Sequence, residues 1–132
     1  MIEQELISIE MLGDLRVSIA AGGSRGDFQN KCWALTWRMG ERRIDHKVRP
    51  DVFKIYSVHV MPAYRGRGLM TDLLRKIIEQ PQVLGSRVRW IYLEQVNFRF
   101  ANHLQRELHF DADFGMVIDC WREATGQMEM RL

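Results

Sequence analysis

One stretch near the middle of the chain changes its hydrophobic period abruptly. Residues 58–60, Val-His-Val, end an alternating segment, and a turn rich in arginine and glycine follows over residues 61–68. Beyond this turn, apolar residues recur at the spacing of one helical face: Leu69, Leu73, Leu74, Ile77 and Ile78. The sequence therefore predicts a strand, a loop and then a helix over residues 68–80, which Pro81 ends.

The turn between this strand and this helix has the chemistry of a phosphate site. The first N–H groups of a helix lack partners and carry about half a positive charge. Glycines let the backbone approach a phosphate closely, and Arg65 and Arg67 add full charges. Three or four charge-assisted hydrogen bonds of roughly 1.5–3 kcal/mol each would give micromolar affinity after ordering costs. The residues alone predict a cradle for phosphate or pyrophosphate.

Patterns elsewhere predict the rest of the fold. Alternating apolar residues indicate strands in the ranges 2–20 (broken at Gly13-Asp14), 32–39, 42–48, 53–60, 87–95, 113–121 and 127–132. A second amphipathic helix is expected over 98–108, and a loop or short irregular helix over 21–31. Together these segments predict a mixed α/β fold with a mostly antiparallel sheet and the strand–loop–helix unit at its centre.

Several residues have expected places in this fold. Gly40-Glu41 and Thr125-Gly126 are expected to form hairpin turns, with Arg42-Arg43 solvated beside the first. Apolar side chains on the strands are expected to face the core, namely Trp33, Trp37, Ile44, Val48, Met128 and Met130.

Composition limits the class of protein. The 132 residues, 46% apolar and 27% charged, suit one globular domain over 1–132 and exclude a disordered chain. A net charge of +2 argues against nucleic acid as the main partner, and no run is long enough to span a membrane. Cys32 and Cys120 lack metal-ligand spacing, so neither a disulfide framework nor a metal site is expected. The acidic start, residues 1–5, is unlike a secretory signal, which favours the cytoplasm.

At the central turn the residues resemble a known family. Residues 60–69, Val-Met-Pro-Ala-Tyr-Arg-Gly-Arg-Gly-Leu, are similar to the acetyl-CoA-binding signature of the GNAT superfamily of N-acyltransferases. That signature has Gln or Arg, two variable residues, Gly, a variable residue, and Gly or Ala. The stretch 65–70 fits it except at the last place, where Met70 would crowd the pyrophosphate or turn toward the core. A Rossmann turn fits less well, because the third small residue of its glycine pattern is replaced by Thr71.

The resemblance implies acetyl-CoA as co-substrate and names the residues that would hold it. Residues 58–60 would bind the pantetheine arm and residues 65–70 the pyrophosphate, namely Val58, His59, Val60, Arg65, Gly66, Arg67, Gly68, Leu69 and Met70. The thioester would lie where the strand ending at residue 60 splays from the strand 87–95. No metal is implied.

Acyl transfer to an amine requires the neutral amine. At pH 7 that costs roughly 4.6 kcal/mol for a lysine and about 1 kcal/mol for an α-amine, so a general base helps. The resemblance makes Glu94 the favoured base, with His59 as a second candidate. Gln105 stands where the family has a tyrosine acid, and glutamine can donate a hydrogen bond but supplies no proton. His109, one helical turn further on, is a weaker candidate for that acid.

These observations predict an acetyltransferase that acts on a primary amine of a protein, a peptide or a small amino compound. The expected acceptor groove has few acidic residues, mainly Asp27, Glu41 and Glu123, which argues against a polycation. The alternative is a weakly active or inactive protein of the same fold that binds a partner protein, as a regulator or a phage-encoded modulator of a host enzyme. The oligomeric state is left open, a dimer included.

Overall fold

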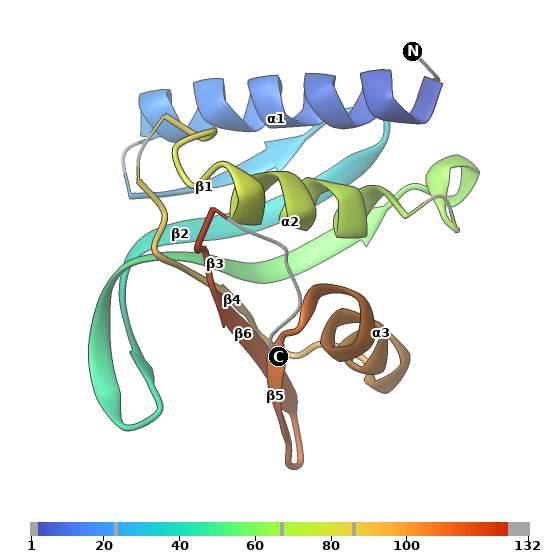
Figure 1. Ribbon diagram of the computed structural model, residues 1–132. Coiled ribbons are helices and arrows are strands. Elements are labelled where there is room, and N and C mark those ends of the chain that lie inside the picture. The colour runs from blue at the N-terminus through green and yellow to red at the C-terminus, as the bar shows by residue number, and fades with distance from the viewer. Residues whose placement is uncertain (1–2, 23, 67, 86, 127–132) are drawn as a thin grey trace.

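The computed structural model describes residues 3–22, 24–66, 68–85 and 87–126 (Figure 1). In chain order the elements are α1 (Glu3–Gly22), β1 (Arg25–Gln29), β2 (Trp33–Ile44), β3 (Lys47–Val60), the short 3₁₀ helix η1 (Pro62–Tyr64), α2 (Leu69–Glu79), β4 (Trp90–Leu93), α3 (Phe98–Leu108), β5 (Asp111–Phe114) and β6 (Ile118–Glu123).

The strands form one six-stranded sheet in the order β1-β2-β3-β4-β6-β5. Only β3 and β4 run parallel, with α2 as the crossover between them, and the other neighbours are antiparallel. Helices α1 and α2 lie together over the β1–β3 part of the sheet, whereas α3 lies beside β5 and β6 (Figure 1). The prediction of a mixed α/β fold with a mostly antiparallel sheet is confirmed.

The main core lies between the three helices and one face of the sheet. Helix α2 contributes the apolar face that its sequence predicts: Leu69, Leu73, Leu74, Ile77 and Ile78 are all buried. Trp33 and Trp37 of β2 are fully enclosed in the same core, as predicted. Each such side chain stabilises the fold by roughly 1.5–3 kcal/mol relative to an exposed one, so these contacts fix the helix on the sheet.

The prediction of strands over residues 2–20 is wrong, because this segment is helix α1. Ile7, Met11, Leu15 and Ile19 are buried at a spacing of four residues, and the helix continues through Gly13. The alternating pattern depended on Ile9 and Val17, and their side chains are 46% and 68% exposed. The loop expected over 21–31 contains strand β1.

The first hairpin turns later than predicted. Strand β2 continues through Gly40, where the pairing with β3 shifts register, so Gly40-Glu41 is a bulge and not a turn. The turn falls at Asp45-His46, both with left-handed backbone, as a two-residue hairpin turn requires. As a result β3 is one strand from Lys47, and Val48 is exposed instead of facing inward.

The C-terminal hairpin also differs from its prediction. It joins β5 to β6 through residues 115–117, and not through Thr125-Gly126. The strand expected over 127–132, with Met128 and Met130, lies outside the described residues.

Cys32 and Cys120 are free thiols, and both are buried. Burial is the main cause that raises the pKa of Cys120 to about 11, and the neighbouring Asp119 charge adds to it. Among the helices that the structure describes, none has the length and apolar character needed to span a bilayer.

Candidate functional site

Strands β3 and β4 part at Ile55. Their pairing ends with Ile55 opposite Leu93, and the Glu94 amide donates the next bond to the Ile55 carbonyl at 3.0 Å. Beyond this point β3 continues to Val60 beside β2 alone, and its pairing with β2 skips Tyr56 in a bulge. The Val96 amide instead bonds to the Ile118 carbonyl of β6 at 2.7 Å. The two strands therefore open a gap in the sheet.

Helix α2 begins close to the end of β3, without a side-chain cap. Its N-cap is Gly68, whose left-handed backbone (φ 70°) glycine adopts without strain. Gly66 also has positive φ, and a Cβ atom built on it would meet nothing within 4 Å. The first helical bond is donated by Asp72 to the Gly68 carbonyl, so the amides of the three residues between have no helical acceptor. Such a helix start suits an anion.

A groove of about 760 Å³ runs from the end of β3, past the start of α2, to one side of α3. Its lining includes two arginines and one histidine from α3, as well as Arg65 from the loop before α2. The lining residues are Val58, Val60, Tyr64, Arg65, Gly66, Gly68, Leu69, Met70, Thr71, Asn97, Arg99, Phe100, His103 and Arg106. No aspartate or glutamate occurs among these described lining residues, so the groove favours a ligand with several negative charges.

The predicted cofactor residues are mostly brought together here. Val58, Val60, Arg65, Gly66, Gly68, Leu69 and Met70 line the groove, whereas His59 does not, because alternate side chains of a strand point to opposite faces. Arg67 lies outside the described residues. Met70 is 7% exposed and packs in the main core, so its side chain does not fill the helix start.

Arg65 is held against the end of β3. Its Nε donates to the Val60 carbonyl at 2.8 Å, and its Nη2 lies 3.5 Å from the His59 Nε2 atom. A guanidinium has five N–H donors, so these two contacts leave others for a phosphate. His59 therefore contacts Arg65 of the candidate site but does not line the groove.

Sequence reasoning missed the contribution of α3. Arg99, His103 and Arg106 line the groove, and His103 Nε2 is 2.9 Å from the Thr71 hydroxyl of α2. Their spacing of four and three residues puts them on one side of the helix. That spacing was visible in the sequence and could have identified them.

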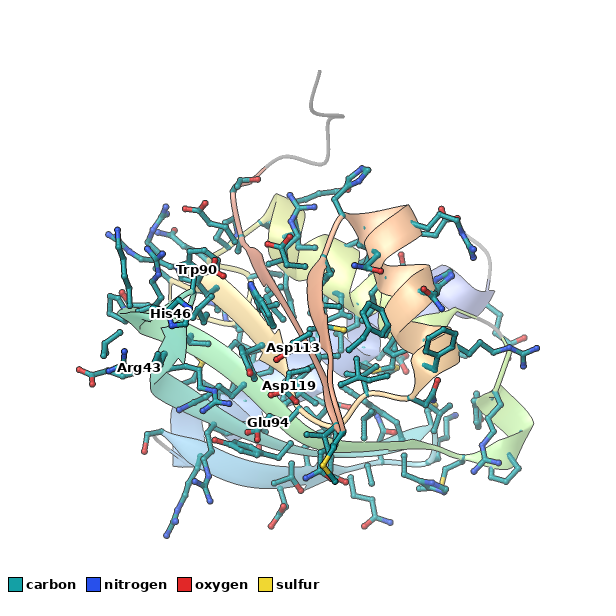
Figure 2. The ribbon with its side chains drawn as sticks, turned by 90° about the horizontal axis from the view of Figure 1, so that it is seen from below. Arg43, His46, Trp90, Glu94, Asp113 and Asp119 are labelled. Carbon is teal, nitrogen blue, oxygen red and sulfur yellow. The ribbon has the colours of Figure 1, made fainter. Side chains whose placement is uncertain are left out.

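Glu94 lies on the opposite face of the sheet from the groove. Ile91 and Leu93 pack in the main core, whereas Tyr92 packs in a second cluster, and alternation puts Glu94 on the Tyr92 side. Figure 2 shows Glu94 beside Asp119 and Asp113 on this open face. Arg42 and Lys54 interact with the Glu94 charge. Burial of the ammonium group is the main reason that the pKa of Lys54 is lowered.

The remaining candidates lie away from the groove. Gln105 is exposed on α3 and is not among the lining residues. His109 is the C-cap of α3 with a left-handed backbone, and its amide bonds to the Leu104 carbonyl. Both positions therefore face solvent at the end of the helix. Among the described residues, no three His, Cys, Asp or Glu side chains gather as metal ligands would.

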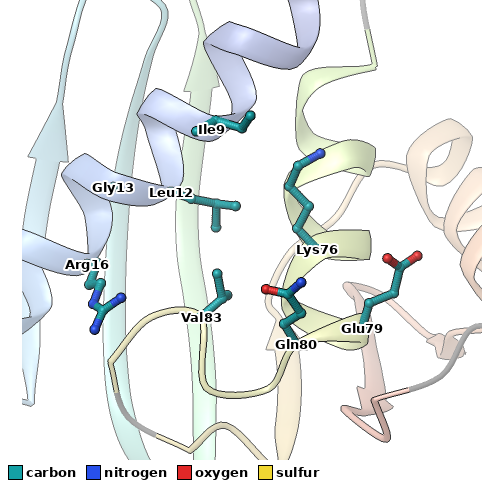
Figure 3. A pocket seen from close by; sticks show the side chains of 8 residues that line it. All are labelled: Ile9, Leu12, Gly13, Arg16, Lys76, Glu79, Gln80 and Val83. Carbon is teal, nitrogen blue, oxygen red and sulfur yellow. The ribbon is translucent and has the colours of Figure 1, made fainter. Parts of the chain in front are cut away.

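A second hollow, of about 340 Å³, lies between α1, α2 and the segment after α2 (Figure 3). Its floor is apolar, with Leu12 and Val83, and its rim carries Arg16, Lys76 and Glu79. Lys76 is already bound to Asp72 at 2.8 Å. With charges of both signs and no helix start, this hollow lacks the features of an anion site.

Residues 31–110 match the model of the acetyltransferase (GNAT) family, over more than half of the chain. The chain belongs to the GNAT family. A comparison with curated proteins finds no match to this GNAT chain.

Solved structures share the GNAT fold at low identity. An acetyltransferase from Thermus thermophilus is 16% identical with a TM-score of 0.52, covering 81% of this chain and 69% of its own. The ribosomal-protein-S18-alanine N-acetyltransferase from Escherichia coli is 17% identical with a TM-score of 0.51, covering 95% and 91%. A mutant of the AtaT toxin, bound to the C-terminus of the antitoxin AtaR and acetyl-CoA, is 13% identical with a TM-score of 0.50. That match covers 70% of this chain, which spans 59% of the toxin.

Proposed function

We propose that this GNAT protein transfers the acetyl group of acetyl-CoA to a primary amine. One observation carries the proposal: the uncapped, glycine-bordered start of α2 opens onto a groove lined by cations, which runs along the part of β3 that lies beyond its pairing with β4. Acetyl-CoA carries its phosphates at one end and its thioester at the other, so a protein of this family needs an anion site joined to a groove that leads to the parted strands.

The residues of the groove divide the ligand between them. Amides at the start of α2 and Arg65 hold the pyrophosphate, while Val58 and Val60 contact the pantetheine arm. Arg99 and Arg106 supply charge for the remaining phosphate. Acetyl-CoA supplies the activated acetyl thioester. The fit rests on the space beside Gly66 and on the absence of carboxylates among the described lining residues.

Glu94 is the proposed general base. It lies where β3 and β4 part, on the face of the sheet opposite the groove. An amine that approaches over this face therefore reaches Glu94 first, and the thioester reaches the same gap from the groove side. Its carboxylate accepts the proton that the acceptor must lose. Gln105 has no proton to give, so the released thiolate takes its proton from solvent.

An α-amine is the proposed acceptor group, in a protein or a peptide. Neutralising it at pH 7 costs about 1 kcal/mol, against roughly 4.6 kcal/mol for a lysine side chain. The open face carries Arg42 and Lys54 beside Glu94, so its charge is mixed and the choice of an α-amine rests on this difference in cost. The E. coli relative, by its name, acts on an alanine of a ribosomal protein.

The first experiment is a calorimetric titration with acetyl-CoA. We expect micromolar binding by the wild type and loss of at least about 100-fold in affinity for the double variant Arg65→Ala/Arg67→Ala. Arg43→Ala is the control, because Arg43 is exposed on the hairpin, away from the groove, and its described hydrogen bond is a local one to the His46 carbonyl. No binding up to millimolar acetyl-CoA would leave the fold without its cofactor and favour the partner-binding alternative.

The second experiment tests the base. The substrates are acetyl-CoA and a panel of short peptides with free N-terminal alanine, serine or lysine, and CoA release is followed with a thiol reagent. Glu94→Gln should bind acetyl-CoA normally and turn over about 10²–10⁴-fold more slowly. A protein that works by docking would show no turnover with the panel, and Glu94→Gln would change nothing.

A further inference from the structure

Three consecutive amides at the end of β4 have three different acceptors. The Glu94 amide donates to the Ile55 carbonyl of β3, and the Val96 amide donates to the Ile118 carbonyl of β6. Between them, the Gln95 amide donates to a side chain, the Asp119 Oδ1 atom, at 3.1 Å. The chain thus changes partner strand within three residues, and Asp119 supplies the middle contact of that change.

The other oxygen of Asp119 contacts β4 at Tyr92, two residues before Glu94 in the chain. Its Oδ2 accepts from the Tyr92 hydroxyl at 2.6 Å, and the Arg42 Nη2 atom lies 3.7 Å away. Arg42 Nη2 also donates to the Tyr92 hydroxyl at 3.0 Å. One carboxylate therefore holds the residue that follows Glu94 and the side chain two residues before it.

The bond between Tyr92 and Asp119 is partly buried, whereas the bond from the Gln95 amide to Asp119 is exposed. Tyr92 is 6% exposed and stacks on Trp121, with ring centroids 5.9 Å apart and planes 10° apart. Burial, and then the hydrogen bond to Asp119, raise the pKa of Tyr92 to about 12. The phenol therefore keeps its proton, and remains a donor to Asp119, at every pH where the protein would work.

The backbone at Gln95 explains why a clamp is needed. Gln95 has φ 55°, a left-handed conformation that is strained for a residue with a side chain. Such a conformation persists where neighbouring contacts impose it. The Asp119 bond is made by the amide of this same residue, so it favours the bend that turns the chain away from β3.

We propose that Asp119 is a positioning residue, which clamps the end of β4 so that the Glu94 carboxylate stays at the parting of the strands. It acts through Glu94 and touches neither substrate. This inference rests on the proposed function, because positioning matters only if Glu94 takes a proton from an acceptor.

Asp113 provides a matched control. It lies on β5 directly opposite Asp119 of β6, on the same open face (Figure 2). The hydrogen bonds described for β4 and its C-terminal end involve Asp119 and not Asp113. A general effect of negative charge on this face would involve both aspartates, whereas a clamp involves Asp119 alone.

The experiment compares Asp119→Ala, Asp119→Asn, Tyr92→Phe and Asp113→Ala with the wild type. Calorimetry gives the Kd for acetyl-CoA, the peptide panel gives kcat and KM, and hydrogen exchange by NMR follows the Gln95 amide. For Asp119→Ala we expect kcat to fall by about 100-fold, because a misplacement of about 1 Å has that effect. Its Kd for acetyl-CoA should stay within about twofold, and its Gln95 amide should exchange faster.

The milder variants separate positioning from folding. Asp119→Asn keeps an oxygen that accepts from the Gln95 amide, so it should retain slow Gln95 exchange and lose only about 3–10-fold in kcat. Tyr92→Phe keeps the Gln95 contact as well and should behave similarly. Asp113→Ala should match the wild type in every measurement.

Three outcomes would each overturn the inference. In the first, Asp119→Ala keeps the wild-type kcat, and in the second, Asp113→Ala loses as much kcat as Asp119→Ala. In the third, Asp119→Ala loses kcat but its Gln95 amide exchanges no faster than in the wild type. A wild type that binds no acetyl-CoA overturns the proposed function and this inference together. Normal binding and turnover with an unaffected Asp119→Ala overturns the inference alone.

Discussion

Two helices begin beside the same groove, and they begin differently. The N-cap of α2 is Gly68, which has no side chain to offer, and its leading amides have no side-chain cap. The N-cap of α3 is Asn97, whose Oδ1 accepts from the Phe100 amide at 2.8 Å. One amide at the start of α3 is thus bonded to the cap, whereas no side chain caps the amides of α2, which leaves them to a ligand.

The side chains show the reverse arrangement. The second residue of α2, Met70, is buried in the core, while the second residue of α3, Arg99, is exposed in the lining of the groove. Helix α2 therefore presents backbone dipoles and α3 presents charged side chains. A ligand with two separated phosphate groups can use both, which is why the two helix starts should respond differently to substitution.

The largest effect on stability is expected at Met70. Met70→Ala should lower the free energy of unfolding by about 3 kcal/mol, because it leaves a cavity in the core. Affinity for acetyl-CoA should change by less than about threefold. Urea denaturation and calorimetric titration measure the two quantities, and a large gain in affinity would show instead that Met70 obstructs the ligand.

A carboxylate at the open helix start should abolish most of the binding. Gly68→Asp puts a negative charge and a capping oxygen where a phosphate would lie, and affinity for acetyl-CoA should fall by about 100-fold. Asn97→Asp makes a similar change at the start of α3 and should cost less than about fivefold. Equal losses in the two variants would remove the distinction between the helix starts.

The parts of the fold that the sequence predicts are those with one strong period. Both α2 and α3 have continuous apolar faces, so their bounds agree with the predicted 68–80 and 98–108 to within a residue. Helix α1 was missed because Ile7, Ile9 and Met11 fit an alternating pattern as well as a helical one. The Asp45-His46 turn was missed because it contains no glycine, the usual signal for left-handed backbone.

The candidate site also has one part that the sequence predicts and one part that it does not. The start of α2 was identified because its Arg-Gly turn is contiguous in the sequence. The contact of Asp119 with Gln95 depends on the register between β4 and β6, which residues far apart in the chain decide together. No local pattern contains that register, so sequence reasoning could name Glu94 but not the residue that holds it in place.

A substitution of the N-cap of α3 should change the stability of the protein without changing its affinity for acetyl-CoA. Asn97→Ala removes the bond to the Phe100 amide and should lower the free energy of unfolding by about 1 kcal/mol. The Kd for acetyl-CoA should stay within about twofold, because this cap serves the helix itself. Thermal unfolding with and without acetyl-CoA checks both statements, and a large change in Kd would mean that Asn97 also contacts the ligand.

The smallest effect is expected at the exposed arginine of α3. Arg99→Ala should weaken acetyl-CoA binding by about fivefold and leave the melting temperature unchanged, because a solvated charge contributes about 1 kcal/mol or less. The loss should shrink as salt is raised. Titrations at low and high salt measure this, and a loss that is independent of salt would argue for packing rather than charge.

The burial of both thiols has a practical and a redox consequence. Cys120 lies on β6 next to Asp119, close to where the proposed reaction sets free the thiol of CoA. Only a thiolate attacks a disulfide, and a fully buried cysteine with a pKa of about 11 offers almost none. Cys120 is thereby protected from exchange with the disulfide form of CoA. Because both cysteines are buried, a thiol reagent added to the folded protein should report released CoA with little background from the chain.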